Sequence, residues 1–550
     1  MIRSILIVSF AAVVFQCAAQ TAPGKYWVRF TDKDNSPFSL DHPQEFLSPE
    51  AVLRRAVYGI PYDLRDLPVN ESYVEEVLSM GECVLHNRSK WFNAITIATE
   101  DTLLIEQIAQ LPFVAETRSV VSWTQPDKGK IGMNVAMPKA DACGEWEKSY
   151  GPSFRQIEML NGHMLHQLGF RGQGMKIAVL DGGFWLADVL PAFAPLRARG
   201  GILGTRDFVA GGESVYGSSN HGTFVLSLMA GIIPDSLCGT APDANYWLFR
   251  TEDVDSEYLV EEDNWVAAAE VCDSLGIDII NSSLGYSLFD DSLQHHSYAD
   301  MDGNTTRVSI AADIAAEKGI LVVNSAGNSG NNAWHYITAP SDGDSVLCVG
   351  AVDAFEWHSG FSGFGPSSDG DTKPNVCAMG SACVIADLDS TIRTGSGTSF
   401  SSPIMAGMSA CLWQAFRAKD NMDIFKAIER SADLYFNPND SLGHGIPDFW
   451  LAFLQLRGQD YNTVAKHVEL WPNPAVGSFN MLVNEPNACS VSVKIFDLSG
   501  RLVYETASLA DFGEISVLRV DPSVADGHYL VGIYIDGVEV DVQRVVITGK

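Results

Sequence analysis

Continuous apolar runs alternate with apolar helical stretches through the middle of the chain. The runs 175–180 and 320–323 are short and turn at glycines, which is typical of strands buried on both faces of a parallel sheet. The stretches 224–229 and 404–413 have helical character, and Gly231 marks the predicted end of the first. Strands and helices in this alternation predict an α/β domain.

Polar residues stand where these elements begin and end. The first apolar run ends on Asp181, and the second breaks into the glycine-flanked amide of Asn328. Open α/β folds place their sites at the carboxyl ends of the strands. His221 stands at the start of a helical stretch, beside Gly222. Taken singly, each residue has an ordinary alternative. Asp181 and Asn328 could be turn residues, and His221 could be a structural or solvated histidine.

Ser399 is the most informative residue. It lies in the segment 397–403, GTSFSSP, at the head of the apolar stretch 404–413. A serine at a helix N-terminus, behind glycines that let a substrate backbone approach, is placed as a nucleophile would be. The alternative is a capped core helix, because serine is a common N-cap and proline suits the first turn.

Together these segments resemble the subtilisin-like serine peptidases over roughly residues 151–458. The motifs are D-G-G after a strand, H-G-T-x-V at a helix start, S-A-G-N and G-T-S-x-S-S-P. The chain order Asp, His, Ser is that of subtilisin and differs from chymotrypsin and the α/β-hydrolases, and Ser399 is not in a G-x-S-x-G elbow. One departure is Gly183, where better-known members have a bulkier residue; we expect altered packing behind Asp181 and unchanged chemistry.

The resemblance implies a role for each motif. Ser399 would be the nucleophile, His221 the general base and acid, and Asp181 the residue that orients the imidazole. Asn328 and the backbone amide of Ser399 would hold the oxyanion. A further match, 279–285, looks like the family's substrate-pairing strand, with the binding residues Ser283, Leu284 and Gly285.

Residues 1–20 have the layout of a secretory signal. Arg3 supplies the positive start, 5–15 the apolar core, and Cys17 begins a small-residue cleavage region. A membrane anchor is disfavoured because the apolar run is too short to span a bilayer. A lipoprotein is the other alternative, although Gln16 is a poor residue before a lipidated cysteine.

Residues 21–121 form a block of their own, a small α+β domain. Its predicted elements are strands at 25–30, 93–98 and 114–121 and a helix at 103–111. A small domain ahead of a secreted peptidase resembles the propeptides of subtilisin-like enzymes, and by that resemblance it would assist folding and block the cleft until cleaved. An ordinary accessory domain is the alternative. Residues 122–150 are the expected connector with the activation cleavage.

After a polar linker at 459–466, residues 467–550 change character. Turn signals separate short predicted strands at 490–496, 501–505, 515–520, 529–535 and 540–547. This spacing predicts an all-β sandwich. P-N-P-A, then I-F-D-L-S-G-R-L-V and a basic terminal strand resemble a type IX secretion sorting domain, with Trp471 in place of the usual Tyr or Phe. A substrate- or carbohydrate-binding sandwich is the alternative.

Charge and cysteine content bear on the partners of the protein and on its disulfides. The 68 acidic and 36 basic residues give a net charge of −32, which repels nucleic acid and favours solubility. Of ten cysteines, nine remain without Cys17, so at least one is unpaired or pairs between chains; Cys377 and Cys383 are the best candidates for a disulfide. No zinc spacing is present, and no later segment is long and apolar enough to cross a membrane.

The chemistry implied by the resemblance needs no cofactor. Structural calcium fits the family, because many secreted relatives bind it, and the acidic turns 341–344 and 369–371 could contribute oxygen ligands. Most acidic turns are simply solvated, and we assign no metal-binding residue.

The leading hypothesis is a secreted zymogen of a subtilisin-like serine endopeptidase. It would reach the medium or the outer cell surface through the type IX machinery and act on proteins or peptides. The non-enzymatic alternative is a catalytically silent adhesin on a peptidase fold. A third hypothesis keeps the enzyme but gives it a narrow processing role.

Overall fold

The computed structural model describes residues 24–121 and 150–457, and in the tail 468–471, 475–476, 478–483, 491–497, 500–508, 515–519, 524–535 and 538–548. The predicted signal, the linker and all of the predicted connector except Tyr150 lie outside the described residues.

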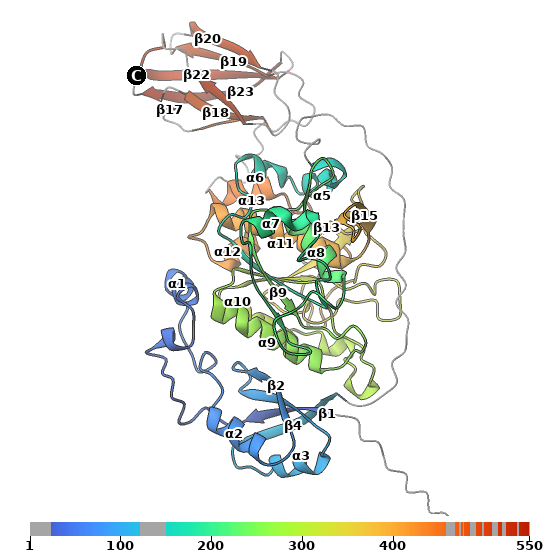
Figure 1. Ribbon diagram of the computed structural model, residues 1–550. Coiled ribbons are helices and arrows are strands. Elements are labelled where there is room, and N and C mark those ends of the chain that lie inside the picture. The colour runs from blue at the N-terminus through green and yellow to red at the C-terminus, as the bar shows by residue number, and fades with distance from the viewer. Residues whose placement is uncertain are drawn as a thin grey trace, which may run out of the picture.

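A seven-stranded parallel sheet forms the centre of the middle part of the chain (Figure 1). Its strand order is β13-β12-β11-β10-β5-β9-β6. The bounds are β5 (Lys176–Asp181), β6 (Ile202–Asp207), β9 (Asn245–Arg250), β10 (Ile279–Ser282), β11 (Leu321–Ser325), β12 (Val346–Val352) and β13 (Val376–Met379). Both predicted apolar runs are inner strands, β5 and β11, and their residues are buried because helices cover both faces of the sheet.

Alternate side chains of β5 enter two different cores. Ile177 and Val179 belong to the core that packs against α8 and α11, whereas Ala178 and Leu180 belong to the core on the side of α9 and α10. The helices of the first face are α8 (His221–Ala230), α11 (Thr398–Ala415), α12 (Asn421–Arg430) and α13 (Phe449–Leu456), and those of the second are α9 (Val260–Leu275) and α10 (Arg307–Glu317). The predicted α/β fold with helices on both faces is confirmed.

Short elements surround this sheet. They are α5 (Phe154–Glu158), α6 (His163–Gln167), α7 (Ala194–Ala198), the pair β7 (Ile232–Ile233) and β8 (Leu237–Cys238), and the hairpin β14 (Cys383–Ala386) and β15 (Ile392–Gly395).

The predicted disulfide between Cys377 and Cys383 is wrong. The seven cysteines among the described residues are all free. Cys377 Sγ lies 3.5 Å from the carbonyl of Leu442, and Cys383 Sγ lies 3.2 Å from that of Met379. The two thiols sit on β13 and β14, which belong to separate sheets, so closeness in sequence does not bring them together.

The N-terminal part is a four-stranded antiparallel sheet with helices, in the order β2-β3-β1-β4. Its elements are β1 (Gly24–Phe30), α2 (Glu71–Ser79), β2 (Val84–Ser89), β3 (Ala94–Thr99), α3 (Thr102–Ile108) and β4 (Val114–Val121). Side chains from these strands and helices form a small core that includes Val28, Val74, Ile97 and Ile108. The α+β prediction is confirmed, although α2 and β2 were not anticipated.

A long excursion, residues 31–69, separates β1 from α2; we call it the strap. It contains α1 (Pro49–Tyr58), which lies away from the N-terminal sheet, beside the central part (Figure 1). Ser48 caps this helix by accepting a hydrogen bond from Ala51 N, and Gly59 ends it at φ 68°.

The tail consists of strands. Three of them form one sheet, β16-β18-β21, and five form another, β17-β23-β22-β19-β20. Their bounds are β16 (Val468–Trp471), β17 (Ala475–Val476), β18 (Ser478–Val483), β19 (Val491–Asp497), β20 (Leu502–Ser508), β21 (Ile515–Arg519), β22 (Gly527–Ile535) and β23 (Val538–Thr548). The all-β prediction for this part is confirmed.

Candidate active site

Asp181 and His221 form a close pair at the carboxyl edge of the sheet. Asp181 is the last residue of β5 and is fully buried, and His221 is the first residue of α8. The imidazole Nδ1 lies 3.0 Å and 2.9 Å from the two carboxylate oxygens. Gly182 N also donates to Asp181 Oδ1, over 2.7 Å. The carboxylate is therefore fixed in place and accepts from Nδ1–H, so that in the neutral imidazole Nε2 is the unprotonated nitrogen and can act as a base.

Two glycines allow this pair to meet. A β-carbon at Gly222 would lie 2.5 Å from the carbonyl oxygen of Gly183, so only glycine permits α8 to start so close to the end of β5. Gly183 itself has φ 140°, and a β-carbon there would lie 2.7 Å from Ser219 N. The departure at this position thus has a local cause, because the chain turns there in a conformation that favours glycine.

Ser399 reaches the same edge from α11, of which it is the second residue. Its Oγ lies 3.4 Å from the carbonyl oxygen of Ser283, while Ser283 Oγ donates to the carbonyl of Ser399 over 3.0 Å. The ring of Phe400 stacks beside that of His221, with centroids 6.3 Å apart. These contacts tie the exit of β10 and the start of α8 to the start of α11.

Asn328 faces the same helix start. Its Oδ1 accepts from Thr398 N over 2.8 Å and from Thr398 Oγ1 over 3.1 Å, which orients the amide. A β-carbon built on Gly397 would lie 3.8 Å from Asn328 Nδ2 and 3.7 Å from Ser399 N. The side-chain amide of Asn328, whose Oδ1 also lies 3.7 Å from that point, and the backbone N–H of Ser399 are therefore close to each other. Converging donors of this kind can stabilise a developing oxyanion.

Ser283, Leu284 and Gly285 follow β10 between Ser399 and the exit of β11. The carbonyl of Leu284 accepts from Asn324 Nδ2 over 3.1 Å. A β-carbon on Gly285 would lie 2.1 Å from Thr338 Oγ1, so the segment packs closely against the chain behind it. The structure thus brings all the site residues predicted from the sequence to one edge of the sheet.

Comparison with known proteins gives three family matches. The model for the peptidase S8 propeptide domain of Bacteroidota matches residues 25–132, that for the subtilase family matches 172–445, and that for a secretion system C-terminal sorting domain matches 469–548. Thermitase of Thermoactinomyces vulgaris is 30% identical over 267 residues, which are 48% of this chain and 82% of thermitase. The chain belongs to the subtilase family.

The chain is also similar to a second curated relative and to a solved structure. The thermophilic serine proteinase of Bacillus sp. (strain AK1) is 29% identical over 264 residues, and the match covers 47% of this subtilase but only 57% of that protein. Among solved structures, the MycP3 protease from the type VII (ESX-3) secretion system matches with a TM-score of 0.44 and 21% identity, over 56% of this chain and 91% of that one. Membership supports the serine peptidase class, and the S8 propeptide and sorting-domain models match the residues on either side of the subtilase match.

The sequence analysis missed a group of acids beside the site of the subtilase. Carboxylate oxygens of Glu252, Glu257 and Glu261 all lie within 4.8 Å of one another. Tyr286 Oη donates to Glu252 Oε1 over 2.7 Å. Burial, and then the nearby Glu257 carboxylate, raise the pKa of Glu252, and burial raises the pKa of Glu261 well above its ordinary value. Only the fold reveals this group, since its members are spread along a loop and a helix start.

This group predicts a pH dependence of stability. The protonated Glu252 stabilises the fold at low pH, and that contribution is lost as the pH rises from 4.5, the ordinary pKa, through the raised pKa of the folded state. We expect Glu252→Gln to lose less thermal stability than the parent between pH 5 and pH 8. Melting curves in a Ser399→Ala background, which guards against autolysis, measure it; the exposed Glu213→Gln is the control. Parallel curves for parent and Glu252→Gln would contradict the assignment.

The two acidic turns noted in the sequence converge in the fold. Carboxylate oxygens of Asp344, Asp369 and Asp371 lie within 4.8 Å of one another, and all three residues are exposed. Asp342 is instead buried and accepts from Gly303 N and Ser309 Oγ. Partial burial raises the pKa of Asp344, and the negative charges of Asp371 and then Asp369 raise it further. The donor set suits a hard cation such as calcium, which these three residues would hold.

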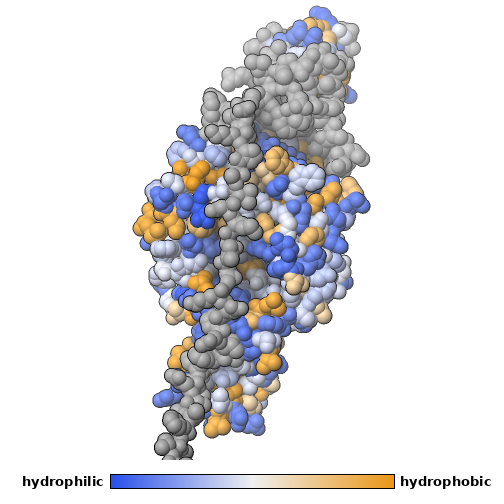
Figure 2. All heavy atoms as spheres, turned by 90° about the vertical axis from the view of Figure 1, so that its right-hand side faces the viewer, coloured by the Kyte–Doolittle hydropathy of each residue, from blue (hydrophilic) through white to orange (hydrophobic). Residues whose placement is uncertain are grey.

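The surface of this subtilase is mixed in character. On the face shown in Figure 2, hydrophilic residues are interspersed with small hydrophobic patches. Within the described residues, no helix has both the length and the apolar character that crossing a membrane requires.

Proposed function

We propose that the chain is a secreted subtilisin-like serine endopeptidase, made as a zymogen, that hydrolyses peptide bonds of proteins through an acyl-enzyme. The observation that carries this proposal is the Asp181–His221 pair, hydrogen-bonded through Nδ1, at the sheet edge that also holds Ser399 and Asn328. Family membership supports the serine peptidase class.

The proposed mechanism uses these groups in turn. Ser399 Oγ forms a bond to the scissile carbonyl carbon, and His221 Nε2 takes the hydroxyl proton. Asp181 keeps the imidazole in the tautomer with its proton on Nδ1 and stabilises the imidazolium. Asn328 Nδ2 and Ser399 N donate to the oxyanion. The C–N bond then breaks as His221 protonates the leaving amine, and water releases the acyl group by the reverse sequence.

We assign substrate binding to Ser283, Leu284 and Gly285. The support is their position directly beside Ser399 at the exit of an inner strand. An extended substrate chain lying along this segment would place its carbonyl carbon next to the nucleophile.

We also propose a division of the chain into its functional parts. It comprises a signal at 1–20, a propeptide at 21–121, a connector cleaved on activation at 122–150, the peptidase domain at 151–458, a linker at 459–466 and the sorting domain at 467–550. The last would engage the type IX machinery and bring the enzyme to the medium or the outer cell surface. The matched S8 propeptide and sorting-domain models support export.

Fluorophosphonate labelling of the purified full-length protein tests the proposal. We expect one labelled band that begins within 122–150 by N-terminal sequencing and that hydrolyses casein. Ser399→Ala should abolish labelling, whereas Ser401→Ala, which alters a buried serine of the same motif, should keep it. A folded, processed band that no fluorophosphonate labels would instead favour the silent adhesin and direct attention to the tail.

A second prediction concerns the oxyanion. Asn328→Ala should keep the fold and the labelling of Ser399 but lower turnover by about 10²- to 10³-fold, the magnitude known for subtilisin, because one donor to the oxyanion is lost. Steady-state kinetics on a peptide substrate measure kcat. Asn332→Ala changes an exposed asparagine of the same loop and serves as the control. Unchanged kcat in Asn328→Ala would remove this amide from the proposed role.

A further inference from the structure

The strap leaves the N-terminal sheet and docks on the peptidase part of the chain. Ser48 N, at the start of α1, donates to the carbonyl of Ser274 at the end of α9 over 2.9 Å. Tyr58, at the end of α1, stacks on Trp413 with ring centroids 6.2 Å apart. A β-carbon on Gly276 would lie 2.7 Å from Ala51 N, so the two backbones are in direct contact. The strap therefore has a docking face of its own.

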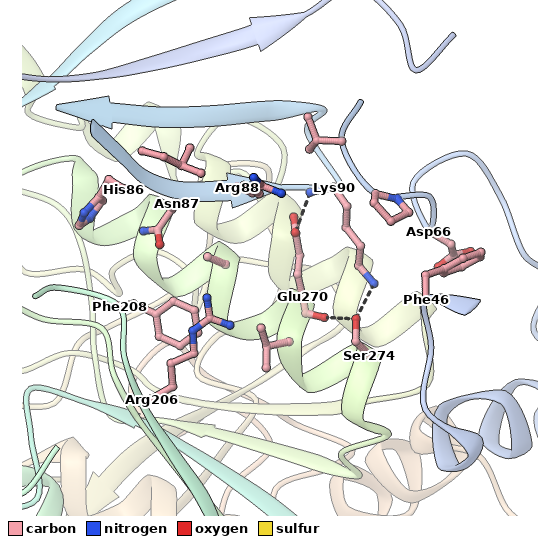
Figure 3. Close-up of a pocket in the computed structure, with 15 residues that line it drawn as sticks. Phe46, Asp66, His86, Asn87, Arg88, Lys90, Arg206, Phe208, Glu270 and Ser274 are labelled. Carbon is pink, nitrogen blue, oxygen red and sulfur yellow. Dashed lines mark hydrogen bonds between the residues drawn. The ribbon is translucent and has the colours of Figure 1, made fainter. Parts of the chain in front are cut away.

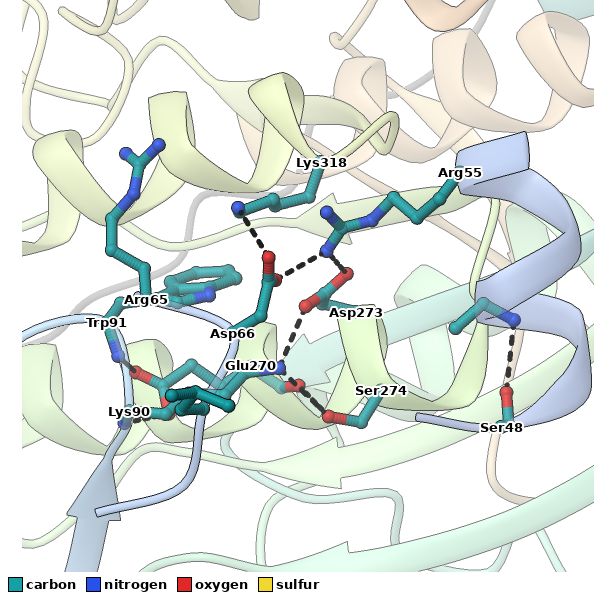
Figure 4. A network of polar contacts seen from close by, with 12 residues as sticks. Ser48, Arg55, Arg65, Asp66, Lys90, Trp91, Glu270, Asp273, Ser274 and Lys318 are labelled. Carbon is teal, nitrogen blue, oxygen red and sulfur yellow. Dashed lines mark hydrogen bonds and ion pairs between the residues drawn. The ribbon is translucent and has the colours of Figure 1, made fainter. Parts of the chain in front are cut away.

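Two adjacent arginines of α1 pair with Asp273 of α9, and Figure 4 shows Arg55 at this carboxylate. Arg54 and Arg55 each place Nη2 2.8 Å from Asp273 Oδ1, and Arg54 Nη1 also donates to the carbonyl of Ile277 over 2.6 Å. The side chains of Arg55 and Asp273 are fully buried, and that of Arg54 is 5% exposed. Lys90, from the turn after β2, completes the set with its Nζ 2.8 Å from Asp273 Oδ2.

Charges on the two sides complement each other in both directions. The three cationic partners of Asp273 all belong to the N-terminal part of the chain. Conversely, the buried Lys318 of the peptidase part pairs with Asp66 and Asp63 of the strap, over 3.1 Å and 2.9 Å. Burial by itself would raise the pKa of Asp273, yet Lys90, Arg55 and Arg54 hold that pKa well below its usual value. The ion pairs therefore keep the buried carboxylate charged.

The sheet side of the interface is built differently. Glu270 of α9 accepts from Ser89 Oγ and from the backbone of Lys90 and Trp91, over 2.6 Å, 2.7 Å and 3.0 Å. Next to it lies a cavity of about 330 Å³ that is lined by residues of β2 and α9, by Arg206 and Phe208, and by the strap residues Phe46, Asp66, Pro68 and Val69 (Figure 3). Glu270 thus receives the end of β2, and Asp273, three residues further along α9, receives the arginines of the strap.

We propose that the strap is a second anchor of the propeptide, separate from its sheet, and that Asp273 is the receptor for its arginine pair. The anchor adds its ion pairs to the contacts of the sheet, so that the propeptide leaves the peptidase domain more slowly after the connector is cut than the sheet alone would allow. This inference rests on the proposed zymogen function for its biological meaning, but the binding itself can be measured without catalysis.

The test uses the full-length chain with Ser399→Ala and an inserted recognition site for a sequence-specific protease within 122–149. The connector is cut in vitro, and size-exclusion chromatography with dilution follows dissociation of the propeptide. We expect the cut parent to elute as one complex. Arg54→Met with Arg55→Met should weaken the complex by on the order of 10²-fold or more, because Asp273 stays buried with two partners removed. Asp273→Asn should weaken it in the same direction.

Controls keep the result interpretable. Arg501→Met removes an exposed pair with Asp497 inside the tail and should leave dissociation unchanged. If the arginine variants do not fold, Tyr58→Ala, which removes the stacking on Trp413 and the hydrogen bond from Tyr58 Oη to the carbonyl of Arg417, should still speed release. Retention of the propeptide by the arginine variants and by Tyr58→Ala as in the parent, or its immediate loss from the cut parent, would overturn the proposal. Because Ser399 is absent throughout, failure of the proposed catalytic function cannot produce either outcome.

Discussion

His221→Ala is expected to lower peptide hydrolysis by about 10⁶-fold, the magnitude known for the corresponding change in subtilisin. In the proposed mechanism the imidazole connects Asp181 with Ser399: its Nδ1 lies 2.9 Å from the carboxylate, and its ring stacks beside that of Phe400, the residue after Ser399. Without it the Ser399 hydroxyl keeps its proton at neutral pH and is a poor nucleophile.

Single-turnover kinetics and fluorophosphonate labelling measure this loss together. The exposed His295→Ala serves as the matched control and should keep full activity. The double variant with Ser399→Ala should be no slower than either single variant, because the two groups act as one unit. Additive losses would show that His221 and Ser399 act independently, and the triad assignment would then fail.

Asp181→Asn is expected to lower turnover by about 10⁴-fold while the fold is kept. Asparagine has the same shape and can still accept from Gly182 N, which now lies 2.7 Å from Oδ1. It can, however, present an N–H to Nδ1, which favours the wrong imidazole tautomer and removes the charge that stabilises the imidazolium. The effect is therefore electrostatic and not a matter of packing.

Determination of kcat, together with a melting curve, separates these two causes. We expect a lowered kcat with a melting temperature close to that of the parent. Asp188→Asn, on the exposed loop that follows β5, is the control for the substitution itself. A variant with kcat near that of the parent would mean that the 2.9 Å contact between Asp181 and His221 has no part in the chemistry.

The prediction of the fold was confirmed where the apolar pattern of a segment directly reflects its burial in the folded protein. The run 175–180 forms an inner strand of a parallel sheet. Because both faces of such a sheet are buried, the strand is apolar at successive positions and can be recognised in the sequence. The motifs around Asp181, His221 and Ser399 carry their own geometry, since a glycine beside a strand end or a helix start is visible in the sequence. The expected convergence of these motifs followed from parallel strands ending at one edge.

Other features depend on residues that are distant in the sequence. The strap was not anticipated, because α1 is stabilised by burial of Arg54 and Arg55 against α9, and buried arginines cannot be told from solvated ones by local pattern. The prediction of a Cys377–Cys383 disulfide was wrong because proximity along the chain does not set the direction of two side chains.

By itself the sequence determined the class of fold, the order of the parts and the identity of the proposed catalytic residues, because each is encoded within a few neighbouring positions. Only the tertiary structure decided which charged groups meet. Glu252 with Glu261, Asp344 with Asp371, and Asp273 with the arginines of the strap are brought together by the packing of separate elements. Electrostatic interaction falls off with distance and rises with burial, and both quantities exist only once the chain is folded.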